Sequence, residues 1–134
     1  MAAAAERYGL PFGVGSQRVA LEVSSRAHDF EVRDVAPTTL LFANLGAIQL
    51  TKGYGPDDAL RAVEMIGADA LFLHLNAMQE VVQDDGDVAW EGVLPKVEEV
   101  CSALSRSAPN IPVVAREVGF GLAADEAKRL MTRA

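Results

Sequence analysis

Short apolar runs alternate along this chain with segments whose apolar residues recur every three or four positions. The runs are almost continuously hydrophobic, which is typical of parallel strands that are buried on both faces. The periodic segments have the spacing of amphipathic helices. The predicted strands are a short segment that ends in Gly13–Arg18, then Thr39–Asn44, a run that begins at Ala70, and Val113–Val118.

The predicted helices are marked by their ends as well as by their apolar faces. Pro56 stands at or near the first position of one helix, and the two aspartates that follow it complement the helix dipole. Gly67 ends that helix. We expect polar loops at residues 24–29 and 83–87. The predicted helices are Ala2–Tyr8, one that opens at Val19–Glu22, Pro56–Ile66, one around Trp90–Ser105 with Pro95 in its first turn, and Ala124–Thr132.

Each predicted strand has a polar residue at its exit: Ser16, Asn44, His74 or Arg116. These residues follow one another at intervals of 28, 30 and 42 positions, close to the roughly 30 residues that one unit of an eightfold β/α barrel occupies. The alternation of strands and helices implies a parallel sheet with right-handed crossovers. We therefore predict one α/β domain over residues 1–134 with about four βα units, as an open four-stranded sheet or a partial (β/α)8 TIM barrel.

Composition and charge argue against some classes of function. Of the 134 residues, 50% are apolar, and the formal net charge of −7 argues against nucleic-acid binding because its long-range field repels polyanions. No apolar run reaches the roughly 18 to 20 residues that span a bilayer, so we expect no membrane segment. The single Cys101 excludes an intramolecular disulfide and suits the reducing cytoplasm. A small anionic ligand, held by backbone N–H groups and arginines, is compatible with this acidity.

The stretch from Ala70 to Glu80 carries the most candidate chemistry. His74 and Asn76 point to the same face as long as the chain stays extended, and Gln79 and Glu80 follow in the loop expected to cap the strand. A lone histidine is more often a hydrogen-bonded core residue, but the three polar side chains that follow it favour a strand-end active site. A metal site here would be rich in oxygen, so Gln79 and Glu80 suit Mg²⁺.

Each of the other strand-end motifs, taken alone, is weaker evidence for a functional site. Gly13–Arg18 offers close backbone approach, a hydroxyl and a guanidinium for a phosphate or carboxylate, and a plain tight turn is equally compatible with it. Asn44, as a lone feature, is an ordinary loop cap. Arg116 and Glu117 form either a strand-end ion pair or part of an anion site.

Taken together, the motifs GVGSQR (13–18), FANLGA (42–47), HLNAMQE (74–80) and AREVGFG (115–121) resemble the type 2 isopentenyl-diphosphate isomerases. The resemblance implies a flavoprotein of isoprenoid biosynthesis that interconverts isopentenyl and dimethylallyl diphosphate with reduced FMN, Mg²⁺ and NADPH. It also implies a (β/α)8 barrel, a homo-oligomer in the full-length family and a cytoplasmic location. The family's first barrel strand and last three or so strands have no counterpart here, so the resemblance implies a fragment from the middle of the barrel.

The same resemblance implies cofactor and metal contacts. Ser16 and Asn44 match FMN contacts, and Arg116 stands where the family usually has a lysine on the flavin. Arginine keeps the charge but replaces a compact ammonium by a bulky planar fork, so we expect the flavin to be held less well there. Glu80 matches the Mg²⁺ ligand.

The resemblance also implies that four residues belong to the substrate pocket. Arg18 matches a contact to the substrate diphosphate, and His74 and Asn76 match catalytic residues of the substrate pocket. Gln79 matches the glutamine near the isomerising carbons, which we expect to orient the substrate because an amide does not titrate usefully. Two alternatives stay open: another FMN-barrel oxidoreductase such as a 2-hydroxy-acid oxidase, and a non-catalytic α/β module that binds a phosphorylated ligand.

Overall fold

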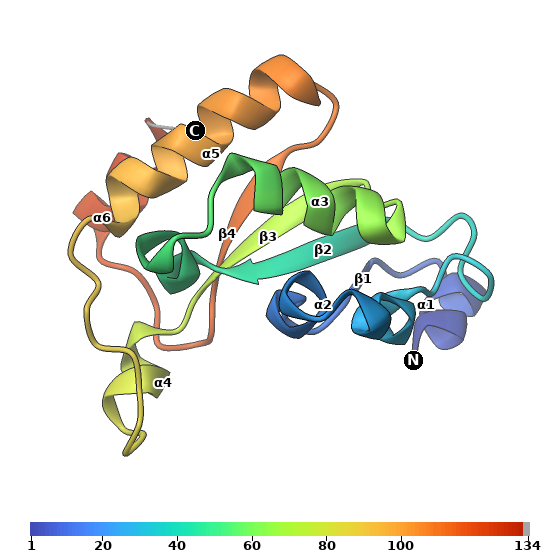
Figure 1. Ribbon diagram of the computed structural model, residues 1–134, viewed down its shortest axis with the longest axis horizontal. Coiled ribbons are helices and arrows are strands. Elements are labelled where there is room, and N and C mark those ends of the chain that lie inside the picture. Colours follow the sequence, from blue (N-terminus) through green and yellow to red (C-terminus); the bar gives the residue numbers. More distant parts are fainter. Residues whose placement is uncertain (133–134) are drawn as a thin grey trace.

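Four parallel strands form one sheet, and helices connect them (Figure 1). The computed structural model describes residues 1–132, and the strand order follows the chain, β1-β2-β3-β4. The strands are β1 (Phe12–Gly13), β2 (Leu41–Gly46), β3 (Ala70–Leu75) and β4 (Val113–Glu117). Parallel pairing in sequential order gives a half-barrel, consistent with part of a (β/α)8 TIM barrel, so the predicted fold class is confirmed.

The connections contain α-helices and 3₁₀ helices. Helix α3 begins with Pro56 at its first position and ends at Gly67, whose φ of 56° is left-handed, as the sequence predicted. The segment expected to be a polar loop at residues 24–29 is instead a 3₁₀ helix, η1. The α-helices are α1 (Ala2–Tyr8), α2 (Arg18–Glu22), α3 (Pro56–Ile66), α4 (Ala77–Val81), α5 (Val93–Ser107) and α6 (Ala124–Met131), and the 3₁₀ helices are η1 (Ser24–Phe30) and η2 (Ala47–Lys52).

Strand β2 begins two residues later than its apolar run suggested. Thr39, in the expected strand, donates its backbone N–H and its hydroxyl to the Glu6 carboxylate at 2.8 and 2.7 Å. This N–H is therefore not available to a strand ladder. Strand β2 starts at Leu41 and continues to Gly46.

The two faces of the sheet are buried unequally. Leu45 and Leu71 are 0% exposed on the face that α3 and α5 cover (Figure 1). On the opposite face, the half-buried rings of Phe42 and Phe72 stack with their centroids 4.1 Å apart and an interplanar angle of 5°. Because alternate residues of a strand point to opposite faces, His74 shares the face of Phe72. His74 therefore lies on the face opposite α3 and α5.

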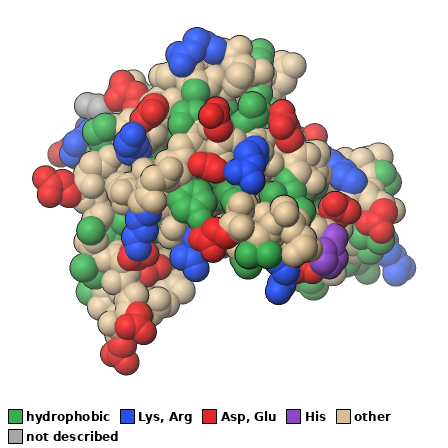
Figure 2. Space-filling model, viewed as in Figure 1, with side chains coloured by type: hydrophobic (Ala, Val, Ile, Leu, Met, Phe, Trp, Pro, Cys, Tyr) green, Lys and Arg blue, Asp and Glu red, His purple; other side chains and the backbone are tan. Residues whose placement is uncertain are grey.

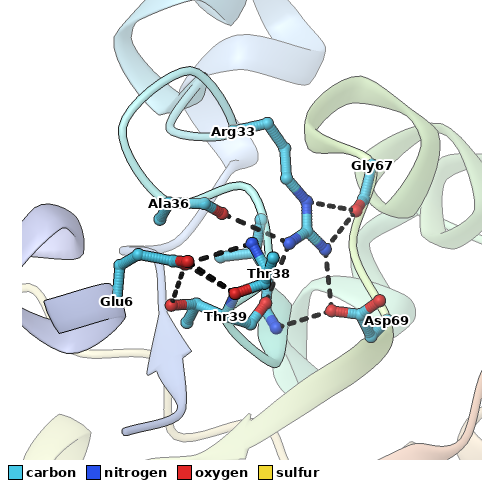
Figure 3. Close-up of polar contacts among 8 residues, drawn as sticks. Glu6, Arg33, Ala36, Thr38, Thr39, Gly67 and Asp69 are labelled. Carbon is cyan, nitrogen blue, oxygen red and sulfur yellow. Dashed lines mark hydrogen bonds and ion pairs between the residues drawn. The ribbon is translucent and has the colours of Figure 1, made fainter. Parts of the chain in front are cut away.

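Glu6 of α1 joins the first helix to the segment before β2 (Figure 3). Its carboxylate accepts hydrogen bonds from the backbone N–H and hydroxyl groups of both Thr38 and Thr39. The hydroxyl of Thr38 and then that of Thr39 are the main causes that lower the pKa of Glu6 from 4.5 to about 2. The folded protein therefore favours the ionised form of this carboxylate.

Arg33 links the segment before β2 to the segment before β3 through hydrogen bonds and an ion pair (Figure 3). Its guanidinium donates to Gly67 O at 2.7 and 3.0 Å and to Thr39 O at 2.8 Å. It also forms an ion pair with Asp69, whose carboxylate accepts from Leu41 N at 2.8 Å. Because these bonds lie at the amino ends of the strands, they stabilise the sheet at the end away from the polar strand exits.

The surface carries charges of both signs. On the face in Figure 2, acidic and basic side chains are interspersed with apolar ones. No helix within residues 1–132 is long and apolar enough to cross a membrane. Cys101 is buried and unpaired on α5, as expected of a lone cysteine.

Candidate functional site

The strand register brings the predicted exit residues to one edge of the sheet. Gly46 of β2 pairs with His74 of β3, and His74 pairs with Arg116 of β4. Asn44 lies two residues before Gly46 and therefore on the same face. Asn44, His74 and Arg116 thus stand on neighbouring strands at the carboxyl edge, which is where the active sites of β/α barrels lie.

His74 is at the centre of this edge. Its Nδ1 lies 2.8 Å from Asn44 Oδ1. Burial is the main cause that lowers the pKa of His74, and the charge of Arg116 lowers it further, against an opposing effect of Glu80. Arg116 lies over the Phe72 ring, with its Cζ 6.0 Å from the ring centroid. The folded protein therefore favours the uncharged form of the His74 imidazole.

Gln17 anchors the loop that faces His74. Its side chain is 0% exposed, its Nε2 donates to Ala62 O at 2.8 Å, and its Oε1 accepts from Asn44 N at 2.9 Å. The flanking residues Ser16 and Arg18 are exposed and line a pocket. The sequence predicted no role for Gln17, because a single sequence does not show that a polar residue is buried. The only signal for a role in the site was its place inside the motif GVGSQR.

A pocket of about 390 Å³ lies at this edge of the sheet. It brings together four of the predicted site residues: Ser16, Arg18, His74 and Glu80. The lining is mostly polar or charged, so it suits a small charged ligand better than an apolar one. The other lining residues are Val19, Gln49, Gln83, Asp85 and Asp87.

The remaining predicted site residues do not line this pocket. Asn44 is 7% exposed and lies behind His74, to which it is hydrogen bonded. Arg116 lies on the next strand, and Asn76 is 8% exposed. Gln79 is exposed on α4. The structure therefore groups part of the predicted set in one pocket and places the rest around it.

The segment after β3 is a helix, not the predicted loop. Strand β3 ends at Leu75, and Asn76, with φ −115° and ψ 30°, opens α4. Two predictions are therefore wrong: Gln79 and Glu80 lie in a helix, and Asn76 does not continue the strand that carries His74. The reason is that Glu80 N donates to Asn76 O at 2.9 Å, which closes a helical turn where extended chain was expected.

Glu80 is held by the acidic loop that follows α4. Its carboxylate accepts hydrogen bonds from Asn76 Nδ2 and from Asp87 N, the latter at 2.7 Å. Asp87 also forms an ion pair with Lys52 at the end of η2. Gly86 allows this close approach, because a Cβ there would lie 1.8 Å from Glu80 O. The loop is polar and exposed at residues 83–85, as predicted, and it folds back on Glu80 at Gly86 and Asp87.

Metal ligands are sparse in the part of the chain that the structure describes. Within residues 1–132, no three His, Cys, Asp or Glu side chains are grouped so that they could hold a metal ion. In the same range, Asn76 Oδ1 is the one buried side-chain polar atom without a hydrogen-bond partner. Glu80, Asp85 and Asp87 line the pocket, so it contains oxygen donors for a hard cation without a closed set of ligands.

The chain is similar to several curated proteins, although no family model matches it. It is 50% identical over 130 residues to the isopentenyl-diphosphate delta-isomerase of Synechocystis sp., covering 97% of this chain and 36% of that protein. It is 48% identical over 132 residues to the protein of the same name from Stutzerimonas stutzeri, covering 98% and 37%. For the Oceanobacillus iheyensis protein of that name, the identity is 42% over 130 residues, covering 97% and 36%. The chain thus spans little more than a third of the length of these relatives.

These relatives correct one interpretation of the sequence. The motifs resemble type 2, FMN-dependent isomerases, but the relatives are named isopentenyl-diphosphate delta-isomerase without a type or a flavin. The assignment to the type 2 class is therefore overturned, and these names neither include nor exclude a flavin. What stands is the similarity of this chain to about a third of an isopentenyl-diphosphate delta-isomerase.

Proposed function

We propose that this chain forms the substrate-binding edge of an isomerase that interconverts isopentenyl diphosphate and dimethylallyl diphosphate. The observation that carries the proposal is the convergence of Ser16, Arg18, His74 and Glu80 on one pocket at the carboxyl edge of the sheet. The relatives named isopentenyl-diphosphate delta-isomerase supply the reaction. Because the chain matches little more than a third of those relatives, the proposal concerns a substrate site and not a complete enzyme.

Arg18 is the side chain that we expect to bind the substrate diphosphate. It is 53% exposed, and its ion-pair partner Glu22 is 3.9 Å away, so its guanidinium is only weakly engaged. Glu22 also accepts a hydrogen bond of 2.6 Å from Tyr54 OH. The planar guanidinium matches two phosphate oxygens at once, and the exposed hydroxyl of Ser16 adds a further donor.

We propose Mg²⁺ as a cofactor because the pocket is too acidic for a bare diphosphate. Glu80, Asp85 and Asp87 line it, and their charges repel phosphate oxygens at short range. A cation held between one carboxylate and the substrate phosphates removes this repulsion, and Mg²⁺ is commonly bound in that way. Glu80 fits this role best, because Asn76 and the backbone of Asp87 hold its carboxylate in place.

We also propose FMN, reduced by NADPH, as a second cofactor. The parallel, stacked rings of Phe42 and Phe72, with the Arg116 cation over Phe72, provide a flat apolar surface and a positive charge for a flat anionic ring, and Ser16 lies at the same edge. A reduced flavin would supply the proton and the electrostatic stabilisation that a 1,3-allylic shift needs. The residues of this chain would bind the alkene, and from its motif Gln79 would orient it, from an exposed position on α4 next to Glu80 of the pocket. The complete enzyme would be a cytoplasmic homo-oligomer.

Mg²⁺-dependent binding of isopentenyl diphosphate to the purified chain, measured by calorimetry, tests the substrate site. Arg18→Gln should weaken binding by roughly 10- to 100-fold, because this is the loss of affinity expected when charge-assisted hydrogen bonds to the diphosphate are removed. Arg61→Gln is a matched control, because Arg61 is 54% exposed and pairs with Asp58 outside the pocket. Equal losses in the two variants, or binding that does not depend on Mg²⁺, would refute the proposal.

Turnover is a separate measurement. The chain is first mixed with oxidised FMN and separated from free flavin, so that visible absorbance of the protein fraction reports whether FMN is bound. It is then incubated anaerobically with isopentenyl diphosphate, FMN, NADPH and Mg²⁺. We expect Gln79→Ala to reduce any turnover that the chain supports and to leave binding of the diphosphate unchanged, since the amide is assigned to the alkene. Unchanged turnover would remove the role given to Gln79.

A further inference from the structure

A continuous set of buried hydrogen bonds leads from helix α3 to the pocket. Gln17 Nε2 donates to Ala62 O, and Gln17 Oε1 accepts from Asn44 N. Asn44 Nδ2 in turn donates to Val14 O at 2.9 Å, and Asn44 Oδ1 lies 2.8 Å from His74 Nδ1. Because Gln17 is 0% and Asn44 is 7% exposed, these bonds are shielded from competition by water.

The direction of these bonds decides which ring nitrogen of His74 carries the proton. A carbonyl oxygen only accepts, so Val14 O requires the amide nitrogen of Asn44 on its side. Asn44 Oδ1 then faces His74, and this oxygen also only accepts. His74 Nδ1 must therefore carry a hydrogen, which leaves Nε2 of the neutral ring without one.

The other ring nitrogen of His74 is available to a ligand. A Cβ at Gly46 would lie 3.0 Å from Nε2 and 3.2 Å from Cε1, so glycine at this position leaves that side of the ring uncrowded. Within residues 1–132, Nε2 makes no hydrogen bond, and it is not among the side-chain atoms buried there without a partner. Since His74 lines the pocket, Nε2 is the ring atom that a bound molecule can meet.

We propose that Asn44 is a positioning residue that holds His74 in the Nδ1-protonated tautomer and presents Nε2 to the pocket as a hydrogen-bond acceptor. The ligand group that meets Nε2 is then a donor, such as the hydroxyl of a singly protonated phosphate or a ring N–H. A fully ionised phosphate oxygen is repelled at this atom and binds at Arg18 instead. This statement about the ligand rests on the proposed function, whereas the tautomer does not.

This role differs from the FMN contact that the sequence resemblance implied for Asn44. Both polar groups of the Asn44 side chain are engaged inside the protein, by Val14 and His74. Its backbone N–H and C=O are also engaged, both by Gln17. Asn44 therefore acts on the pocket through His74.

Long-range ¹H–¹⁵N spectra of the ¹⁵N-labelled chain at neutral pH test this proposal without any substrate. The chain has 2 histidines, and a His28→Gln variant assigns the signals of His74. We expect a protonated Nδ1 and an unprotonated Nε2 for His74 in the unsubstituted chain. A predominantly Nε2-protonated ring would overturn the proposal.

Two variants at position 44 separate a positioning role from a structural one. Asn44→Ala removes the oxygen that accepts from Nδ1. The tautomer ratio should therefore shift about tenfold toward the Nε2-protonated ring, because this factor corresponds to the free energy of one ordinary hydrogen bond. Asn44→Asp keeps an acceptor facing His74 and should keep Nδ1 protonated. An unchanged ratio in Asn44→Ala would overturn the proposal. If Asn44→Ala does not fold, loss of Nδ1 protonation in Asn44→Asp would overturn it.

Gly46→Ala distinguishes this inference from the proposed function. The added Cβ crowds Nε2 but leaves the Asn44–His74 bond in place, so the tautomer should persist while Mg²⁺-dependent binding of isopentenyl diphosphate falls. A tautomer that changes in Gly46→Ala would overturn the assignment to Asn44. Failure of isopentenyl diphosphate to bind the unsubstituted chain would refute the proposed function alone, since the spectra need no ligand.

Discussion

Replacing Gln17 with leucine tests whether this buried amide holds the site loop to the sheet. Leucine is close to glutamine in size, so Gln17→Leu leaves no large cavity. The change removes the donor to Ala62 O and the acceptor of Asn44 N, which are both buried hydrogen bonds. Asn44 N–H then has no partner, and an unpartnered buried donor costs about 1–3 kcal/mol.

The lost hydrogen bond to Ala62 O adds a smaller cost to that of the unpartnered Asn44 N–H. We therefore expect the free energy of unfolding to fall by about 2–3 kcal/mol. Urea unfolding followed by circular dichroism measures this change, and the slope m should stay constant because unfolding exposes the same surface. Gln79→Leu is the matched control, because Gln79 is exposed, and its effect should stay within about 0.5 kcal/mol. A loss for Gln17→Leu no larger than that of the control would refute the anchoring role.

Two further predictions concern Glu6 and Gly86. The folded pKa of Glu6 is about 2 against an ordinary 4.5, so its contribution to stability is fully present above pH 4.5 and is lost as the pH falls toward 2. The free energy of unfolding should therefore drop more between about pH 5 and about pH 3 in the unsubstituted chain than in Glu6→Gln, and equal drops would contradict this. Gly86→Ala should push the loop away from Glu80, since the new Cβ would lie 1.8 Å from Glu80 O, and should speed amide exchange at Asp87. Gly55→Ala, where a Cβ meets nothing within 4 Å, should leave that exchange unchanged, and similar rates in the two variants would count against the predicted displacement.

Local patterns in the sequence were enough to locate most elements. Helices α1 and α3 begin and end where the sequence predicted, because helix propensity, a proline at the first position and a glycine after the last act within a few residues. The apolar run from Ala70 is strand β3, and Pro95 lies in the first turn of α5. The interval between polar strand ends predicted the half-barrel for a similar reason, since one βα unit has a characteristic length.

The candidate site was predictable only in part. Arg18, His74 and Glu80 were proposed from their motifs, and all three line one pocket. Gln79 was assigned to the same loop, but it is exposed on α4, because Asn76 ends the strand and starts a helix. The stretch after β3 is short and has no clear period, so its sequence did not distinguish a loop from one helical turn.

The sequence by itself determined the four strands and the longer helices, their order along the chain and the polar residues at the strand ends. Only the tertiary structure decided which of those residues anchor the site and which face the pocket. Gln17 meets Asn44 across 27 positions, and Asn44 meets His74 across 30. Such partners are chosen when strands come into register, and a hydrogen bond between distant residues leaves no period or composition in the sequence. For that reason Asn44 was predicted as a cofactor contact, whereas the packed sheet places it behind His74 as the acceptor for its Nδ1 proton.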